Sequence, residues 1–105
     1  MRVYQQAIEM NRQLALVVPR IERGDRDLVR QMKRAASSVA LNLAEGIGSR
    51  GGNRELRFQT AFGSAREVQA CMDVAMAWGY IGECEAKGTV DCVVAMLCNL
   101  VKARR

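Results

Sequence analysis

Residues 42–50 read NLAEGIGSR, and this stretch decides how the chain folds. It closes a segment of helical apolar spacing with a glycine-rich turn, and a second segment of helical spacing follows the turn. We expect the helix before the turn to end near Glu45, with Gly46 in the left-handed conformation that terminates many helices. Asn53 is the expected N-cap of the next helix. The stretch therefore predicts two long helices joined by a short turn.

Apolar residues recur throughout the chain at the three- and four-residue steps of an amphipathic helix. Four helices are expected, over about 2–18, 25–45, 54–79 and 83–103. Only 5% of the residues are aromatic although 50% are hydrophobic, so the core must be largely aliphatic, which suits packed helices better than a sheet. We therefore predict one all-α domain over residues 1–105, folded as an antiparallel up-and-down four-helix bundle.

The ends and the buried faces of these helices can also be predicted. Pro19 is expected to end the first helix, Asp25 to cap the second and Gly79 to end the third. Small residues at 63–65 should let a neighbouring backbone approach the third helix. The expected core positions are Val3, Ala7, Met10, Leu14 and Val17; Leu28, Met32, Ala35, Val39 and Leu43; Phe58, Phe62, Ala65, Gln69, Met72 and Met76; and Val90, Val94, Leu97 and Val101, with Val93 and Leu100 beside them.

Several classes of function are disfavoured by the composition. The chain has no histidine, so Ser-His-Asp and Cys-His arrangements are impossible, and it has no phosphate-loop motif. Carboxylates have nearby partners, such as Glu83 with Lys87 at i,i+4. The four cysteines lack the close spacing of a zinc site and are expected to be small core residues. We expect no catalytic activity, no cofactor and no metal.

The chain also lacks the features of a membrane or exported protein. No apolar run approaches the roughly 20 residues needed to cross a bilayer. The first residues, MRVYQQ, do not contain the apolar core of a signal peptide. We expect a cytoplasmic protein with no membrane partner.

Charge is distributed unevenly along the chain. Residues 1–66 carry twelve basic and six acidic residues, a net of +6, whereas residues 67–105 carry four basic and five acidic residues, a net of −1. In the second helix the cations fall opposite the expected core stripe, on a surface that we call the basic ridge. It consists of Arg26, Arg30, Lys33 and Arg34. Such a ridge indicates either a polyanionic partner, most often nucleic acid, or the ordinary solvated face of a surface helix.

A second group of arginines surrounds the glycine-rich turn: Arg50, Arg54 and Arg57. Backbone N–H groups at the start of a helix can bind phosphate. Asn42 and Glu45, just before the turn, are expected to hydrogen-bond a neighbouring helix or the loop backbone, with direct contact to a ligand as the alternative.

Two stretches of the chain resemble a known family. Residues 34–46, RAASSVALNLAEG, are similar to the hallmark of bacterial four-helix-bundle proteins associated with intervening sequences of 23S rRNA genes. A second hallmark comprises Phe58, AFGSARE at 61–67 and GYI at 79–81. The chain departs from the family pattern at 51–53, where GGN replaces the usual serine and glutamate, and at Gly88 in the fourth helix.

The resemblance implies a bundle that assembles into a ring, a homopentamer. It extends distantly to the accessory variability proteins of diversity-generating retroelements, which bind nucleic acid and partner a reverse transcriptase. By that analogy, the basic ridge and the arginines of the turn would contact RNA or DNA. Broad apolar surface on the first and fourth helices also favours a homo-oligomer. The alternative is a scaffold or adaptor that binds a protein, such as a reverse transcriptase or another enzyme.

Overall fold

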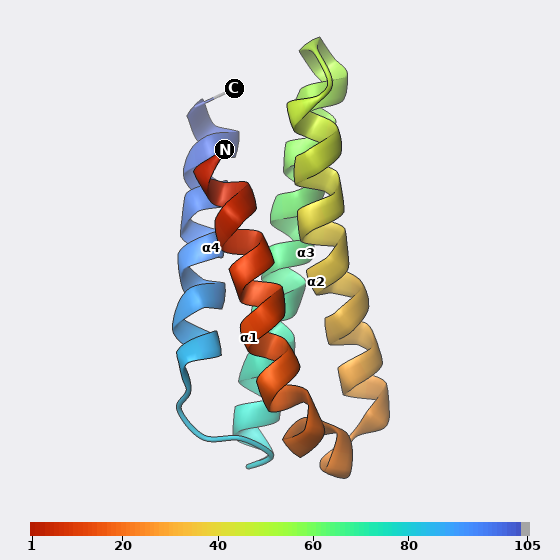
Figure 1. Ribbon diagram of the computed structural model, residues 1–105, viewed down its shortest axis with the longest axis vertical. Helices are drawn as coiled ribbons and strands as arrows, with labels where there is room; N and C mark the ends of the chain where they lie inside the picture. The colour runs from red at the N-terminus through yellow and green to blue at the C-terminus, as the bar shows by residue number, and fades with distance from the viewer. Residues whose placement is uncertain (104–105) are drawn as a thin grey trace.

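The chain forms four antiparallel helices in a computed structural model that describes residues 1–103 (Figure 1). They are α1 (Arg2–Gly24), α2 (Arg26–Ile47), α3 (Gly51–Ala77) and α4 (Glu85–Ala103). Each helix packs against the next along the chain, and α4 returns to pack against α1. This is the predicted up-and-down arrangement, about 43 Å long and 20 Å wide.

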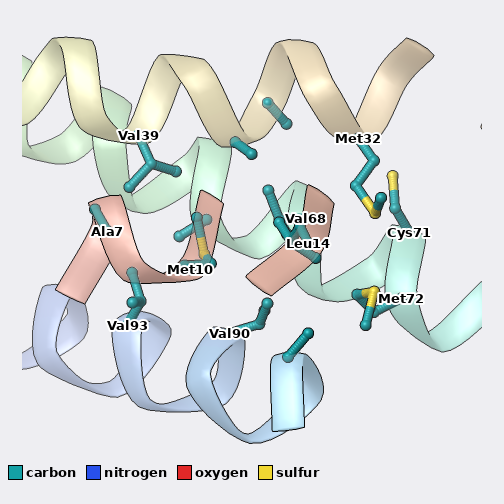
Figure 2. Packing of buried hydrophobic residues seen from close by; sticks show 14 of the residues in the cluster. Ala7, Met10, Leu14, Met32, Val39, Val68, Cys71, Met72, Val90 and Val93 are labelled. Atoms are coloured by element: carbon teal, nitrogen blue, oxygen red, sulfur yellow. The ribbon is translucent and has the colours of Figure 1, made fainter. Parts of the chain in front are cut away.

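The core lies along the bundle axis and is aliphatic, as the composition predicts (Figure 2). All ten core positions predicted for α1 and α2 are buried. In α3 and α4, six predicted residues are only partly buried: Phe62, Gln69, Met76, Val94, Leu100 and Val101. Gln69 shows the reason, because it lies at the edge of α3 that faces α4 and donates a 3.0 Å hydrogen bond to Asp91. The residues predicted from heptad-like spacing in α3 therefore include some at the edge of the buried face of the helix, not only at its centre.

The predicted end of the first helix is wrong. Pro19 lies inside α1, which continues to Gly24. Proline costs a helix one hydrogen bond and crowds the preceding turn. The last turn is nevertheless retained, because Ile21 is fully buried and its carbonyl accepts a 2.8 Å bond from the N–H of Asp25. Burial of Ile21 therefore outweighs the local effect of Pro19.

Asp25 and Gly79 mark helix ends as predicted. The carboxylate of Asp25 accepts a 2.9 Å hydrogen bond from the N–H of Leu28 and caps α2. Gly79 has φ of 77°, a left-handed conformation that a glycine adopts easily. Its N–H bonds Met76 O at 3.0 Å, and the N–H of Tyr80 bonds Ala75 O at 2.9 Å. These two bonds form a Schellman motif that ends α3.

The turn between α2 and α3 differs from the prediction at two residues. Gly46 is not left-handed but lies buried inside α2, which runs on to Ile47. A Cβ atom there would lie 2.5 Å from the Phe58 ring, so glycine is needed for close helix packing. Asn53 is not an N-cap, because α3 already begins at Gly51 and the Asn53 side chain donates to Ser49 Oγ at 3.1 Å.

The cysteines are free and only one of them is a core residue. Cys71 is buried, Cys84 and Cys98 are partly buried, and Cys92 is exposed. The prediction of small core residues is therefore correct for Cys71 alone. Burial, with a smaller contribution from the charge of Glu67, raises the pKa of the Cys71 thiol and keeps it protonated. Among the described residues, no helix is long and apolar enough to cross a membrane.

Candidate nucleic-acid interface

The basic ridge lies on the outer face of α2, opposite the core. Its members Arg26, Arg30, Lys33 and Arg34 are all exposed. The nine residues from Arg26 to Arg34 span about 12 Å of helix axis. The predicted placement of these four cations on one solvent-facing surface is confirmed.

Most of the ridge charge is not neutralised by the protein. Arg30 Nη2 lies 3.3 Å from Asp27 Oδ1, but both side chains are more than 70% exposed, so the pair is weak. For Arg26, Lys33 and Arg34, no ion pair is found within residues 1–103. The ridge therefore presents cationic side chains to solvent.

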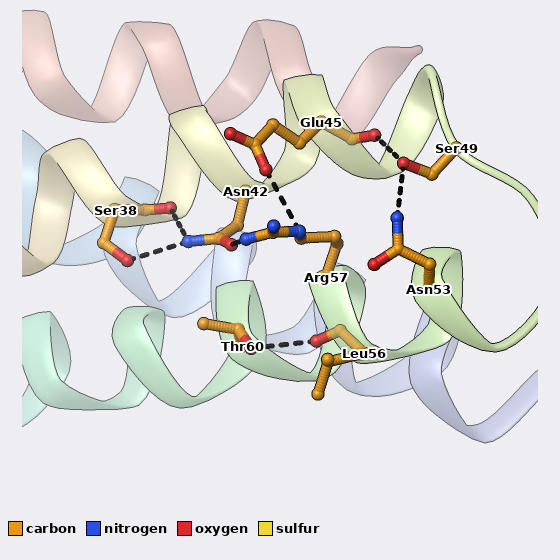
Figure 3. Close-up of polar contacts among 8 residues, drawn as sticks. All are labelled: Ser38, Asn42, Glu45, Ser49, Asn53, Leu56, Arg57 and Thr60. Carbon is orange, nitrogen blue, oxygen red and sulfur yellow. Dashed lines mark hydrogen bonds and ion pairs between the residues drawn. The ribbon is translucent and has the colours of Figure 1, made fainter.

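Arg57 has a different environment, because it joins α3 to α2 (Figure 3). Its Nη1 donates a 3.3 Å hydrogen bond to Asn42 Oδ1, and its Nε lies 3.0 Å from Glu45 Oε2 in an ion pair. The Asn42 amide in turn donates to Ser38 O and Ser38 Oγ at 2.9 and 3.0 Å. Ser38 Oγ also lies 2.8 Å from Ser64 Oγ of α3. Asn42 and Glu45 thus contact the neighbouring helix, as predicted.

Arg54 satisfies the carbonyl groups at the end of α2. Its Nε donates to Gly46 O and its Nη2 to Ile47 O, each at 3.1 Å. The last carbonyls of a helix have no partner within it and carry the negative end of its dipole, so an arginine stabilises them. Ser49 Oγ adds a 2.7 Å bond to Glu45 O. Sequence spacing did not reveal this capping role, because Arg54 comes from the next helix.

The seven predicted contact residues therefore occupy two separate places. The ridge covers the first half of α2, whereas Arg50 is exposed just before α3, at the other end of the hairpin. From Arg34 to Ile47 the helix rises about 20 Å. Nucleic-acid contact stays a prediction for all seven, but the structure gives Arg54 and Arg57 protein partners.

In the second half of the chain, one lysine is paired with two carboxylates. Lys87 Nζ lies 2.7 Å from Asp91 Oδ1 and 3.5 Å from Asp73 Oδ1. The predicted pair of Glu83 with Lys87 is wrong, because Glu83 precedes α4 and is not one helical turn away from Lys87. The hydrogen bond from Lys87, helped by Gln69, lowers the pKa of Asp91, and the same bond raises the pKa of Lys87.

Large apolar side chains are also exposed on the bundle. Leu41, Ile47 and Leu56 lie on the α2–α3 hairpin, Leu16 on α1, and Val74 and Trp78 near the end of α3. The small-residue stretch 63–65 is divided: Ser64 and Ala65 face the bundle, whereas Gly63 is exposed with nothing within 4 Å of its would-be Cβ. Within the described residues, no group of three or more Cys, Asp or Glu is placed to hold a metal ion.

The chain matches a known protein family over nearly its whole length. The family model described as 23S rRNA-intervening sequence protein matches residues 1–99, nearly the whole chain. No curated protein sequence matches the chain. The match includes both the basic ridge and the α2–α3 turn.

Proposed function

The chain belongs to the 23S rRNA-intervening sequence protein family, and we propose that it is a non-catalytic homo-oligomer that binds RNA or DNA. The basic ridge binds the phosphates. The observation that carries this proposal is that Arg26, Lys33 and Arg34 are exposed and have no carboxylate partner within residues 1–103. Phosphate oxygens suit such a row of mostly arginine side chains.

Binding through the ridge has low sequence specificity. Phosphate contacts fix the position of a nucleic acid and do not read its bases. Arg54 and Arg57 contribute little, because their guanidinium groups already bind α2. Arg50 is exposed and provides a separate contact at the far end of the hairpin.

Self-association is supported by the exposed apolar surface. Leu41 and Leu56 are 64% and 58% exposed on the hairpin, and large apolar groups at a surface commonly mark interfaces. Gly63 gives a second reason, since a glycine inside a helix costs roughly 1 kcal/mol and nothing in residues 1–103 lies within 4 Å of its would-be Cβ. Close approach of another copy at α3 would offset it. The family resemblance favours a homopentameric ring for this assembly.

The test is binding of RNA and DNA to the purified protein at 50 and 200 mM salt, with oligomer mass measured in the same samples. Four cations on a single strand give a slope of about −2.8 in log K against log salt. Affinity should then fall about 50-fold between the two concentrations. A flat salt response, or no binding at 50 mM by a well-formed oligomer, contradicts the proposal.

The same exposed leucines favour a second function, that of a scaffold or adaptor for another protein. The two functions make different demands on the ridge. Alanine at Arg26, Arg30 and Arg34 should abolish nucleic-acid binding in the first case. In the second case the same three substitutions should leave capture of the protein partner intact.

A further inference from the structure

The α1–α2 turn and the α3–α4 connection lie at the same end of the bundle (Figure 1). Trp78 is the C-cap residue of α3, at the start of that connection. It is the single tryptophan of the chain and is 73% exposed. Its ring stacks on that of Tyr80, with centroids 6.5 Å apart and planes 14° from parallel. A tryptophan is rarely left this exposed without a contact to make.

Tyr80 joins this stack to the backbone of the α1–α2 turn. The Tyr80 ring lies directly on Gly24, where a Cβ atom would be 2.3 Å from the ring. The Schellman hydrogen bonds after α3 fix the backbone of Tyr80. We call the offset pair of rings, Tyr80 on Gly24 and Trp78 beside it, the aromatic column. The Trp78 ring is the exposed member of this pair.

Cationic side chains lie beside the column. Arg23, Arg26 and Arg30 line an open hollow of about 500 Å³ that includes Gly24. Two of the carboxylates in this turn are engaged, since Asp25 caps α2 and Asp27 pairs with Arg30.

The hollow itself carries no net charge, because Arg23, Arg26 and Arg30 are matched by Glu22, Asp25 and Asp27. The positive charge lies along the basic ridge. Glu22 lines the same hollow, and Glu83 lies in the α3–α4 connection; neither has an ion pair within residues 1–103. The hollow is continuous with the basic ridge, because Arg26 and Arg30 belong to both. The aromatic column borders this hollow, because the Tyr80 ring lies on Gly24, which lines it.

We propose that Trp78 is a stacking site for one base of a single-stranded nucleic acid whose phosphates follow Arg23, Arg26 and the rest of the ridge. The inference rests on the proposed function and adds to it a preference for single strands. A base in a duplex is covered on both faces by its neighbours, whereas an unpaired base can stack on an indole. Stacking on one aromatic side chain strengthens binding roughly 5- to 150-fold.

The experiment uses the fluorescence of Trp78, which reports on this site alone. The full-length protein is titrated at 50 mM salt with a 12-nucleotide RNA, the DNA strand of the same sequence, the corresponding DNA duplex and an abasic strand with equal phosphates. We expect quenching by both base-bearing single strands and little quenching by the duplex or the abasic strand. With a labelled strand, Trp78→Leu should bind roughly 5- to 150-fold more weakly, and Trp78→Phe should recover part of the loss.

Leu16→Ala is the matched control, since Leu16 is 77% exposed on another helix and should bind like the parent protein. Salt-dependent binding with unchanged Trp78 fluorescence and no effect of Trp78→Leu overturns the stacking site and leaves the proposed function intact. Absence of binding by every strand overturns both. A blue shift of Trp78 emission that rises with protein concentration, without nucleic acid, means that a second copy covers the indole and also overturns the stacking site.

Discussion

The basic ridge and the α2–α3 turn are both rich in arginine, but their arginines differ in exposure and in hydrogen-bond partners. Arg26 and Arg34 of the ridge are exposed and have no carboxylate partner within residues 1–103. Arg54 and Arg57 are half-buried and bind the carbonyls, Asn42 and Glu45 of α2. The difference shows that an arginine count does not locate a binding surface. The groups that face each guanidinium decide whether its charge is available.

The largest effect should come from disturbing the packing beneath the turn. Phe58 is 1% exposed and lies against Gly46, so Phe58→Ala should lower the free energy of unfolding by about 3–5 kcal/mol. Denaturant unfolding measures the change. Gln59→Ala is the control, because Gln59 is exposed beside Phe58 and its replacement should cost less than about 0.5 kcal/mol. Equal losses from the two substitutions would mean that the turn is not packed as described.

A smaller effect, on binding alone, should follow from reversing charge on the ridge. Arg30→Glu combined with Arg34→Glu removes two of the four cations. The salt slope should become shallower, changing from about −2.8 to about −1.4 or closer to zero. Stability should change by less than about 0.5 kcal/mol, because both side chains are exposed. Fluorescence anisotropy of a labelled RNA at several salt concentrations measures the slope. An unchanged slope would remove the ridge from the interface.

The sequence predicts the helices and most of the core because these depend on local periodicity. The buried stripes of α1 and α2 and the ends at Asp25 and Gly79 are correct for this reason. The helix ends predicted at Pro19 and Gly46 are wrong, because packing in the folded chain outweighs their local tendency to end a helix.

The candidate site was predicted less completely, for a related reason. The exposed row on α2 follows from helical geometry alone. The partners of Arg54 and Arg57 lie seven to fifteen residues away, on another helix, and no spacing rule connects them. The stack of Trp78 on Tyr80 likewise depends on the turn after α3 and on contact with Gly24.

Arg57→Ala should have a moderate effect on stability and none on the salt slope. It leaves Asn42 Oδ1 and Glu45 without their partner, and since Glu45 is more than half exposed the cost should be about 1 kcal/mol. A double-mutant cycle with Glu45→Ala should give a coupling of about 0.2–1 kcal/mol. Arg34→Ala serves as the matched control with no loss of stability. A changed salt slope for Arg57→Ala would move the interface towards the turn.

The smallest effect on stability should come from breaking the ion pair of Lys87 with Asp91. Like Arg57 with Glu45, it joins two opposite charges of the same chain. Because the folded-state pKa of Asp91 is lowered, its contribution is present above the ordinary value of 3.8 and is lost as the pH falls through the folded-state pKa. For Lys87 the pKa is raised, so its contribution is present below 10.5 and is lost as the pH rises through the folded-state pKa.

Since Asp91 is nearly half exposed, the pair contributes at most about 1 kcal/mol. Asp91→Asn should flatten the fall in melting temperature of the parent protein below pH 3.8. Identical pH profiles for the two proteins would contradict the assignment.

Arginine modification tests the central distinction most directly. The protein is treated with phenylglyoxal, with and without a 12-nucleotide RNA at 50 mM salt, and the modified arginines are identified by mass spectrometry. We predict that Arg26, Arg30 and Arg34 react in the free protein and are protected by RNA, whereas Arg54 and Arg57 react slowly in both samples. Ready reaction of Arg54 and Arg57 in the free protein, with RNA protecting them and not the ridge, would contradict the account.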